Sequence, residues 1–290
     1  LPFNGRYLAL WSTTDPDCDR VGAVVLHNGK YLPLNGNQLG ALLLSYILEA
    51  KSEEGTIPSN SAIVKTVVTS EVANGIAAKY NVTVFDTLTG FKYIAELMQQ
   101  FEENKDYSFL FGYEESYGYL AGTFVRDKDA VIASMLICEM AAYYKKLGKT
   151  LIDVLGEIYE EQGYFIEETV SLNFTGIAGQ SKMKSIMEYF RENKLNSIAD
   201  KNIPAIKDYK MSSSFNLVEG TTKKLDYPKS DVLKFCFEDG SWLVLRPSGT
   251  EPKLKVYFSI KGKNKDCSLK TLEKVKGEIL SIIERIQINF

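Results

Sequence analysis

The chain has 290 residues, a formal net charge of −3, a hydrophobic share of 45% and a charged share of 24%. These values are typical of a soluble globular protein that is long enough for two domains. The net negative charge argues against a positively charged surface for nucleic acid, and no apolar run is long enough to span a bilayer. We therefore expect a cytoplasmic protein with neither a nucleic-acid nor a membrane partner.

Strands and helices alternate in the first half of the predicted structure. The pattern predicts strands at 6–14, 21–26, 30–34, 62–69, 82–85 and 107–111, and helices at 38–51, 70–79 and 90–101. Asn28-Gly29 marks a hairpin turn, and Ser70 is expected to cap its helix. Such alternation indicates βαβ units around a mixed, mainly parallel sheet in three layers.

The second half begins with helices and then changes character. Helices are predicted at 129–147, 151–162 and 181–193, with an extended segment at 164–174. Residues 196–210 are polar, contain Pro204, and are predicted to include a linker. Strands at 232–237, 242–245 and 254–260 and a final helix at 268–288 follow. The fold class is therefore α/β, with a three-layer domain followed by a smaller α+β domain that has an antiparallel sheet.

Three aspartates follow the first predicted strand at alternate positions, namely Asp15, Asp17 and Asp19. Alternate side chains of an extended backbone share a side, so the three carboxylates can converge on a hard cation such as Mg²⁺ or Ca²⁺. An EF-hand is excluded because Arg20 and Leu26 occupy the positions that need glycine and an acid. An aspartyl-phosphate phosphatase and a solvated acidic turn are the alternatives.

The segment from Arg246 to Pro252 joins two predicted strands. It holds a guanidinium, the hydroxyls of Ser248 and Thr250, and Gly249, whose backbone can approach a ligand closely. These groups suit a dianionic phosphate. The alternative is a polar hairpin with a surface arginine.

A third polar segment follows the predicted strand at 107–111. Glu114 and Ser116 lie there between glycines, where a carboxylate and a hydroxyl could bind adjacent sugar hydroxyls. An acidic surface loop is an equal alternative. Arg126 and Lys128 precede the next helix, where plain surface charge is one interpretation. A lysine among cations can instead have a lowered pKa and serve in proton transfer.

These segments, together with Thr87-Leu-Thr-Gly-Phe91, resemble the α-D-phosphohexomutase (phosphoglucomutase/phosphomannomutase) family in order and spacing. The resemblance runs from about Thr14 to the C-terminus. It implies Mg²⁺ on the three aspartates and hexose hydroxyls on Glu114 and Ser116. It also implies the following roles: Arg20 and Lys128 near the transferring phosphoryl group, Thr89, Gly90 and Phe91 as a specificity loop, Arg126 in substrate binding, and Arg246, Ser248, Gly249 and Thr250 on a phosphate.

One family feature is missing, the phosphorylated serine of a Ser-His motif, since the one histidine is His27. The chain is therefore expected to be a C-terminal part whose partners are a sugar phosphate and the N-terminal domains of the same enzyme. Residues 1–36 would be the remnant of domain II with the metal loop, 37–200 the sugar-binding domain III, and 201–290 the phosphate-binding domain IV.

The resemblance implies an enzyme that moves a phosphoryl group between the 1- and 6-positions of a hexose phosphate through a hexose 1,6-bisphosphate. This chain alone is expected to be inactive, because the phosphoryl donor is not in it. A phosphopentomutase of the same family and a non-catalytic phosphosugar-binding protein are the alternatives.

Overall fold

The computed structural model describes residues 10–174, 176–249 and 251–288. The chain divides into two compact units, Leu1–Gln162 and Gly163–Phe290. The sequence pattern places this boundary between residues 200 and 201, so residues 163–200 join the second unit instead of the first. The cause is a long-range pairing: strand β8 (Tyr164–Asn173) pairs along its whole length with β16 (Lys253–Gly262).

A small antiparallel sheet opens the first unit. Its order is β1-β2-β3, formed by β1 (Leu10–Thr14), β2 (Val21–His27) and β3 (Lys30–Leu34). Asn28 and Gly29 both have positive φ, at 49° and 74°, as the Asn-Gly pair predicts for the hairpin turn. Residues 6–9 of the predicted first strand lie outside the described residues.

The second sheet of this unit has the order β5-β4-β6-β7. It comprises β4 (Ser61–Thr66), β5 (Thr83–Thr87), β6 (Ser108–Glu114) and β7 (Gly118–Ala121). The first three strands of that order run parallel and β7 runs antiparallel, which confirms a mixed, mainly parallel sheet. Strand β6 is longer than predicted, so Glu114 ends a strand instead of lying in a loop.

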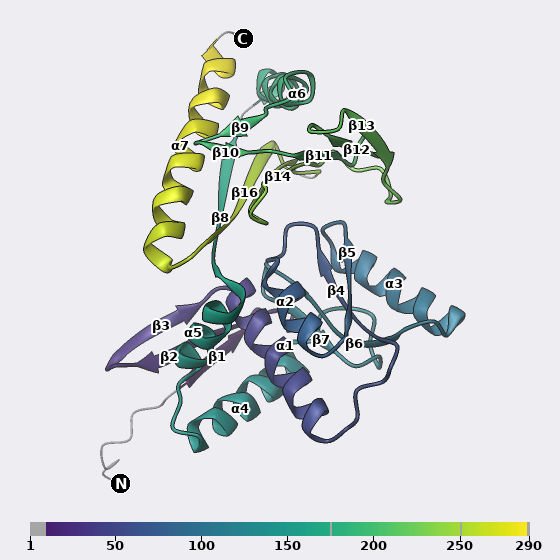
Figure 1. Cartoon of the computed structure of the whole chain (residues 1–290), viewed down its shortest axis with the longest axis vertical. Helices are drawn as coiled ribbons and strands as arrows, with labels where there is room; N and C mark the ends of the chain where they lie inside the picture. Colours follow the sequence, from purple (N-terminus) through teal and green to yellow (C-terminus); the bar gives the residue numbers. More distant parts are fainter. Residues whose placement is uncertain (1–9, 175, 250, 289–290) are drawn as a thin grey trace. The chain divides into compact units, whose positions relative to one another are not determined.

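Helices cover both faces of this sheet (Figure 1). On one face, Ala62 and Val64 pack against Ile94 and Met98 of α3 (Phe91–Asn104). On the other lie α1 (Gly36–Glu53) and α2 (Val72–Lys79), followed in the chain by α4 (Ala130–Lys146) and α5 (Leu151–Gln162). The N-cap of α2 is Glu71, not Ser70 as expected. The three-layer prediction is confirmed.

The second unit is built on a seven-stranded antiparallel sheet of order β13-β12-β11-β14-β15-β16-β8. A hydrophobic core joins one face of this sheet to two helices. The further elements are β9 (Ser197–Ile198), β10 (Lys201–Asn202), β11 (Ala205–Asp208), β12 (Ser213–Asn216), β13 (Thr221–Lys224), β14 (Leu233–Cys236), β15 (Trp242–Pro247), α6 (Gly176–Glu192) and α7 (Lys265–Ile288).

Residues 196–210 are therefore not a linker, because they supply β9, β10 and the inner strand β11. The prediction of an antiparallel α+β domain is confirmed. No helix within the described ranges is both long enough and apolar enough to cross a bilayer.

Candidate active site

The aspartate loop between β1 and β2 folds around the side chain of Asp15. Its Oδ1 accepts hydrogen bonds from the backbone N–H groups of Asp19 at 3.2 Å and Arg20 at 3.1 Å. The bond from Arg20 is the main reason that the pKa of Asp15 lies below its ordinary value. The guanidinium of Arg20 lies 3.7 Å from Asp15 Oδ2 and 3.6 Å from Asp19 Oδ1. The Asp15 carboxylate is thus held in its charged form beside a cation.

Two backbone hydrogen bonds fix this loop against segments a hundred residues later in the chain. The N–H of Val21 donates to the carbonyl of Tyr117, and the N–H of Ala130 donates to that of Cys18, each at 3.2 Å. The aspartate loop therefore lies beside the β6–β7 turn and the start of α4.

Lys128 reaches the aspartate loop from the segment before α4. Its Nζ lies 3.0 Å from Asp19 Oδ2 and 2.7 Å from Asp127 Oδ1, and 5.5 Å from the centre of the Phe91 ring. Its stem passes Gly118, where a Cβ atom would lie 2.4 Å from Lys128 Cδ. Burial opposes the charge, but the bonds to Asp127 and Asp19 outweigh it and raise the pKa of Lys128. A lowered pKa suited to proton transfer, expected from the sequence, is therefore corrected.

Glu114 is buried at the end of β6. Its Oε1 accepts a hydrogen bond of 2.8 Å from the N–H of Gly90, whose φ of 120° favours glycine. Burial raises the pKa of Glu114, although that hydrogen bond and the charges of Lys128 and Arg20 act in the opposite direction. The predicted residues Arg20, Gly90, Glu114 and Lys128 are thus brought into one place at the carboxyl end of the parallel strands.

The next carboxylate, Glu115, is held by residues that the sequence analysis did not single out. The hydroxyls of Thr66 and Thr69 donate to Glu115 Oε2 at 3.4 Å and 3.5 Å. Both threonines lie at or just after the end of β4, and that position in a parallel sheet was the available signal. Ser116 is half-buried beside Glu115, and Thr89 is half-buried beside Gly90.

Arg126 has different surroundings. Its Nη1 donates to the carbonyl of Thr123 at 2.6 Å, and its Nη2 pairs with Glu102 of α3. It borders a shallow pocket on α3 that also includes Lys92 and Glu96. Its recorded contacts are therefore with α3 and its own loop.

The three aspartates do not form a preorganised metal site. The described residues contain no cluster of three or more His, Cys, Asp or Glu side chains that could hold a metal ion. Asp17 is exposed, and Arg20 and Lys128 supply positive charge beside Asp19. Even so, the buried Asp19 Oδ1 accepts no hydrogen bond, and an all-oxygen donor set suits a hard cation. The chemistry of the donors fits Mg²⁺, although they do not converge.

The Arg246 segment belongs to the second unit. Arg246 is the last residue but one of β15 and lies opposite Lys255 of β16, and its Nη1 donates to the Tyr257 hydroxyl at 3.3 Å. Ser248 Oγ accepts from the N–H of Glu251 at 3.3 Å, which closes a tight turn. Gly249 is exposed, and a Cβ there would meet nothing within 4 Å. Thr250 lies outside the described residues.

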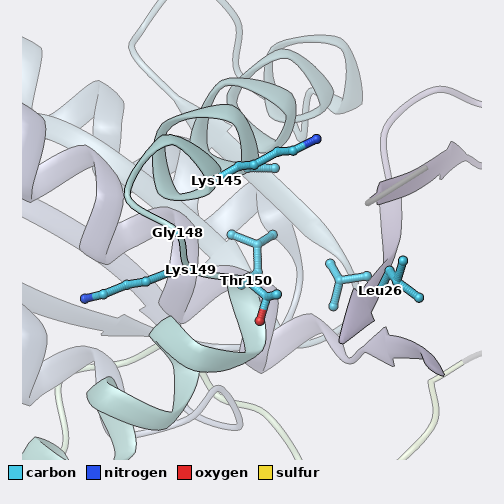
Figure 2. Close-up of a pocket in the computed structure, with 8 residues that line it drawn as sticks. Leu26, Lys145, Gly148, Lys149 and Thr150 are labelled. Carbon is cyan, nitrogen blue, oxygen red and sulfur yellow. The ribbon is translucent and has the colours of Figure 1, made fainter. Parts of the chain in front are cut away.

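A cavity elsewhere in the first unit, of about 250 Å³, contains none of the predicted site residues. Figure 2 shows that Lys145 and Lys149, on its rim, point in different directions, away from Thr150. His27 contacts this region through a hydrogen bond of 2.9 Å between Nδ1 and Thr150 Oγ1. That contact agrees with a structural role for the histidine.

Known proteins resemble the chain in both units. Residues 35–161 match the family description "Phosphoglucomutase/phosphomannomutase, alpha/beta/alpha domain III", and residues 193–266 match "Phosphoglucomutase/phosphomannomutase, C-terminal domain". A phosphoglucomutase of Staphylococcus saprophyticus is 39% identical over 254 residues, which are 87% of this chain and 45% of that protein. The chain therefore spans about half the length of the curated relatives that it matches.

Solved structures share the fold. The pp63/parafusin phosphoprotein of Paramecium, a phosphoglucomutase, has a TM-score of 0.62 at 18% identity, over 96% of this chain and 45% of that one. An N-acetylphosphoglucosamine mutase of Aspergillus fumigatus, in complex with GlcNAc-6P and magnesium, has a TM-score of 0.51 at 13% identity, over 98% and 50%.

Proposed function

The chain belongs to the phosphoglucomutase/phosphomannomutase family, and on that premise we propose that it is the substrate-holding part of a hexose-phosphate mutase. The full enzyme would move a phosphoryl group between the 1- and 6-positions of a hexose through a bisphosphate. The observation that carries this proposal is the joint position of Glu114, Gly90, Lys128 and Asp19, because a buried carboxylate that could bind sugar hydroxyls lies near cations that could bind a phosphoryl group.

Each group of the first unit has a separate task in this proposal. Glu114 and Ser116 bind adjacent sugar hydroxyls. The Thr89–Phe91 turn, whose Gly90 N–H donates a hydrogen bond to Glu114, contributes to sugar specificity. Lys128 and Arg20 stabilise negative charge on the phosphoryl oxygens. Because its pKa is raised, Lys128 stays protonated and acts as a fixed cation. Arg126 contacts substrate only if it leaves Glu102.

Asp15, Asp17 and Asp19 would hold Mg²⁺, which the donor chemistry and the buried Asp19 Oδ1 support. The magnesium complex of the Aspergillus mutase, a protein of similar fold, agrees with this role. When bound, the ion would withdraw charge from the phosphoryl oxygens.

Arg246, Ser248, Gly249 and Thr250 would bind the phosphate that is not being transferred. A phosphate held at one end of the sugar fixes the orientation of the other end, an effect that can lower a barrier by roughly 7–11 kcal/mol in well-aligned systems. Residues 1–36 are proposed as the end of domain II and residues 37–162 as domain III, while residues 163–290, which form the second unit, are proposed as domain IV. The phosphoryl donor would lie outside this chain, so binding without turnover is expected of it.

Calorimetric titration of glucose 6-phosphate into the chain tests the proposal. Arg246→Ala should weaken binding by about 1.5–3 kcal/mol, the worth of a charge-assisted hydrogen bond. Lys263→Ala, an exposed cation just after β16, is the matched control and should change little. Equal losses in the two variants, or no binding by the wild type, would contradict the assignment. Ribose 5-phosphate in place of the hexose separates the pentose alternative.

A further inference from the structure

Residues 115–117 form the turn between β6 and β7, and the backbone of this turn is strained. Tyr117 has a φ of 68°, a region that bulky side chains rarely adopt. Strain of this kind persists only where the surrounding structure imposes it. The contacts that hold the turn therefore decide where Ser116, its middle residue, is placed.

Backbone contacts hold the turn at two points. The N–H of Val21, at the start of β2, donates to the carbonyl of Tyr117 at 3.2 Å. The start of α1 packs against the carbonyl of Glu115, so closely that a Cβ on Gly36 would lie 2.0 Å from that oxygen. The side chain of Glu115 takes no part in either contact.

That side chain reaches the loop that follows β4. The hydroxyls of Thr66 and Thr69 lie 2.8 Å apart, and they donate to Glu115 Oε2 at 3.4 Å and 3.5 Å. We call these two residues the threonine pair. Both are fully buried, so bulk water does not compete for their hydroxyls. The threonine pair therefore ties the turn to β4 through Glu115.

The threonine pair is itself fixed by hydrogen bonds of the backbone. The N–H of Thr66 donates to Thr69 Oγ1 at 3.3 Å, and the N–H of Thr69 donates to the carbonyl of Thr66 at 3.0 Å. The next N–H, that of Ser70, donates to Asn37 Oδ1 at 3.0 Å, which joins the loop to the start of α1. Glu115 is thus attached to a rigid part of the unit.

The two neighbouring carboxylates are held from different strands. Glu114 accepts its hydrogen bond from Gly90, which follows β5, whereas Glu115 accepts from the threonine pair after β4. Within the described residues, no hydrogen bond is recorded for the hydroxyl of Ser116, which comes next in the turn. That hydroxyl is therefore available to a ligand beside Glu114.

We infer that Thr66 and Thr69 are positioning residues for the sugar: they hold the turn through Glu115, so that Ser116 is in place beside Glu114 before the sugar binds. The inference rests on the proposed function of Glu114 and Ser116 and adds two residues that act through Glu115. A group that is ordered in advance loses less conformational freedom on binding, so the turn binds the sugar more tightly.

Replacement of both hydroxyls in the whole chain tests this inference. Thr66→Val/Thr69→Val exchanges each hydroxyl for a methyl group, whereas Thr66→Ser/Thr69→Ser keeps both hydroxyls. Ser61→Ala, at the opposite end of β4, removes another buried hydroxyl and is the matched control. Amide hydrogen exchange of residues 114–118, followed by NMR, measures the turn without a ligand, and calorimetry measures the affinity for glucose 6-phosphate.

The valine variant should show two changes relative to wild type. The amides of residues 114–118 should exchange about three- to tenfold faster, and glucose 6-phosphate should bind about three- to tenfold more weakly, the worth of about one hydrogen bond. The serine variant and Ser61→Ala should stay within about twofold of wild type in both measurements. Unchanged exchange or unchanged affinity in the valine variant would show that the inference is wrong.

Glu115→Ala separates positioning of the turn from support of the β4 loop, since the valines also remove the acceptor of the Thr66 N–H. Glu115→Ala alone should reproduce both changes, which tests the inference even where the valine variant does not fold. Adding the two valines to Glu115→Ala should weaken binding no further, and losses that multiply would refute the inference. If the wild type binds no sugar phosphate, the proposed function fails, and the exchange rates still show whether the threonine pair holds the turn.

Discussion

At Gly36, the packing of α1 against the turn that follows Glu114 depends on the absence of a side chain. It begins α1, and a Cβ there would lie 2.0 Å from the carbonyl oxygen of Glu115 and 2.9 Å from the backbone nitrogen of Tyr117. Its own carbonyl accepts a hydrogen bond of 3.1 Å from the Tyr119 hydroxyl. Because the obstructing atoms are backbone, Gly36→Ala must move the turn that follows Glu114.

The cost of such overpacking is about 1–3 kcal/mol, and the gain in helix propensity from alanine, at most about 1 kcal/mol, offsets part of it. We expect Gly36→Ala to lower the free energy of unfolding by about 1–2 kcal/mol. Gly156→Ala in α5 is the matched control, because a Cβ there meets nothing within 4 Å. It should raise stability by about 0.5–1 kcal/mol.

Urea unfolding followed by circular dichroism measures the stability of both variants. Calorimetry with glucose 6-phosphate measures how the displaced turn changes the affinity for the ligand. Gly36→Ala should also bind the ligand more weakly, since the turn carries Ser116 between Glu115 and Tyr117. Gly156→Ala should bind as wild type does. If both variants are equally stable and bind equally well, the turn can move freely away from α1, and the packing argument is refuted.

Two further predictions concern buried charges. Lys65, fully buried on β4, lies 2.8 Å from Asp86 and 3.0 Å from Glu71, so Lys65→Met should destabilise the chain by about 3 kcal/mol in urea unfolding. Adding Asp86→Asn should recover part of the loss, and a fully stable single variant would contradict this. Burial raises the pKa of Glu114 in the folded chain. The stability that Glu114 contributes is therefore present below the pKa that it has in the unfolded chain, and it is lost as the pH rises through the pKa that it has in the folded chain. Glu114→Gln should therefore gain stability relative to wild type between pH 4 and pH 7 in thermal melts, while its sugar-phosphate binding weakens. If the difference in melting temperature between the variant and wild type does not change with pH, the pKa of Glu114 is not raised.

Much of the local structure follows from neighbouring residues alone. Helix α4 lies within one residue of the predicted bounds at each end, and Asp129 caps it, because its Oδ1 accepts from the N–H groups of Val131 and Ile132. Helix α5 has the predicted bounds, and the Asn28-Gly29 turn has the predicted conformation. The order of polar segments also carried the family resemblance, which the two domain matches confirm. Each of these features depends on residues that are close in sequence.

Only the tertiary structure decided which distant segments meet. It moved residues 163–200 into the second unit through the pairing of β8 with β16, and it bound Arg126 to α3. It also reversed the expected pKa shift of Lys128, because Asp19, more than a hundred residues earlier, supplies one of the neighbouring charges. Strand pairing and the electrostatic surroundings of a side chain depend on the packing of separated segments. A pattern of neighbouring residues fixes where an element forms, but not what it will lie against.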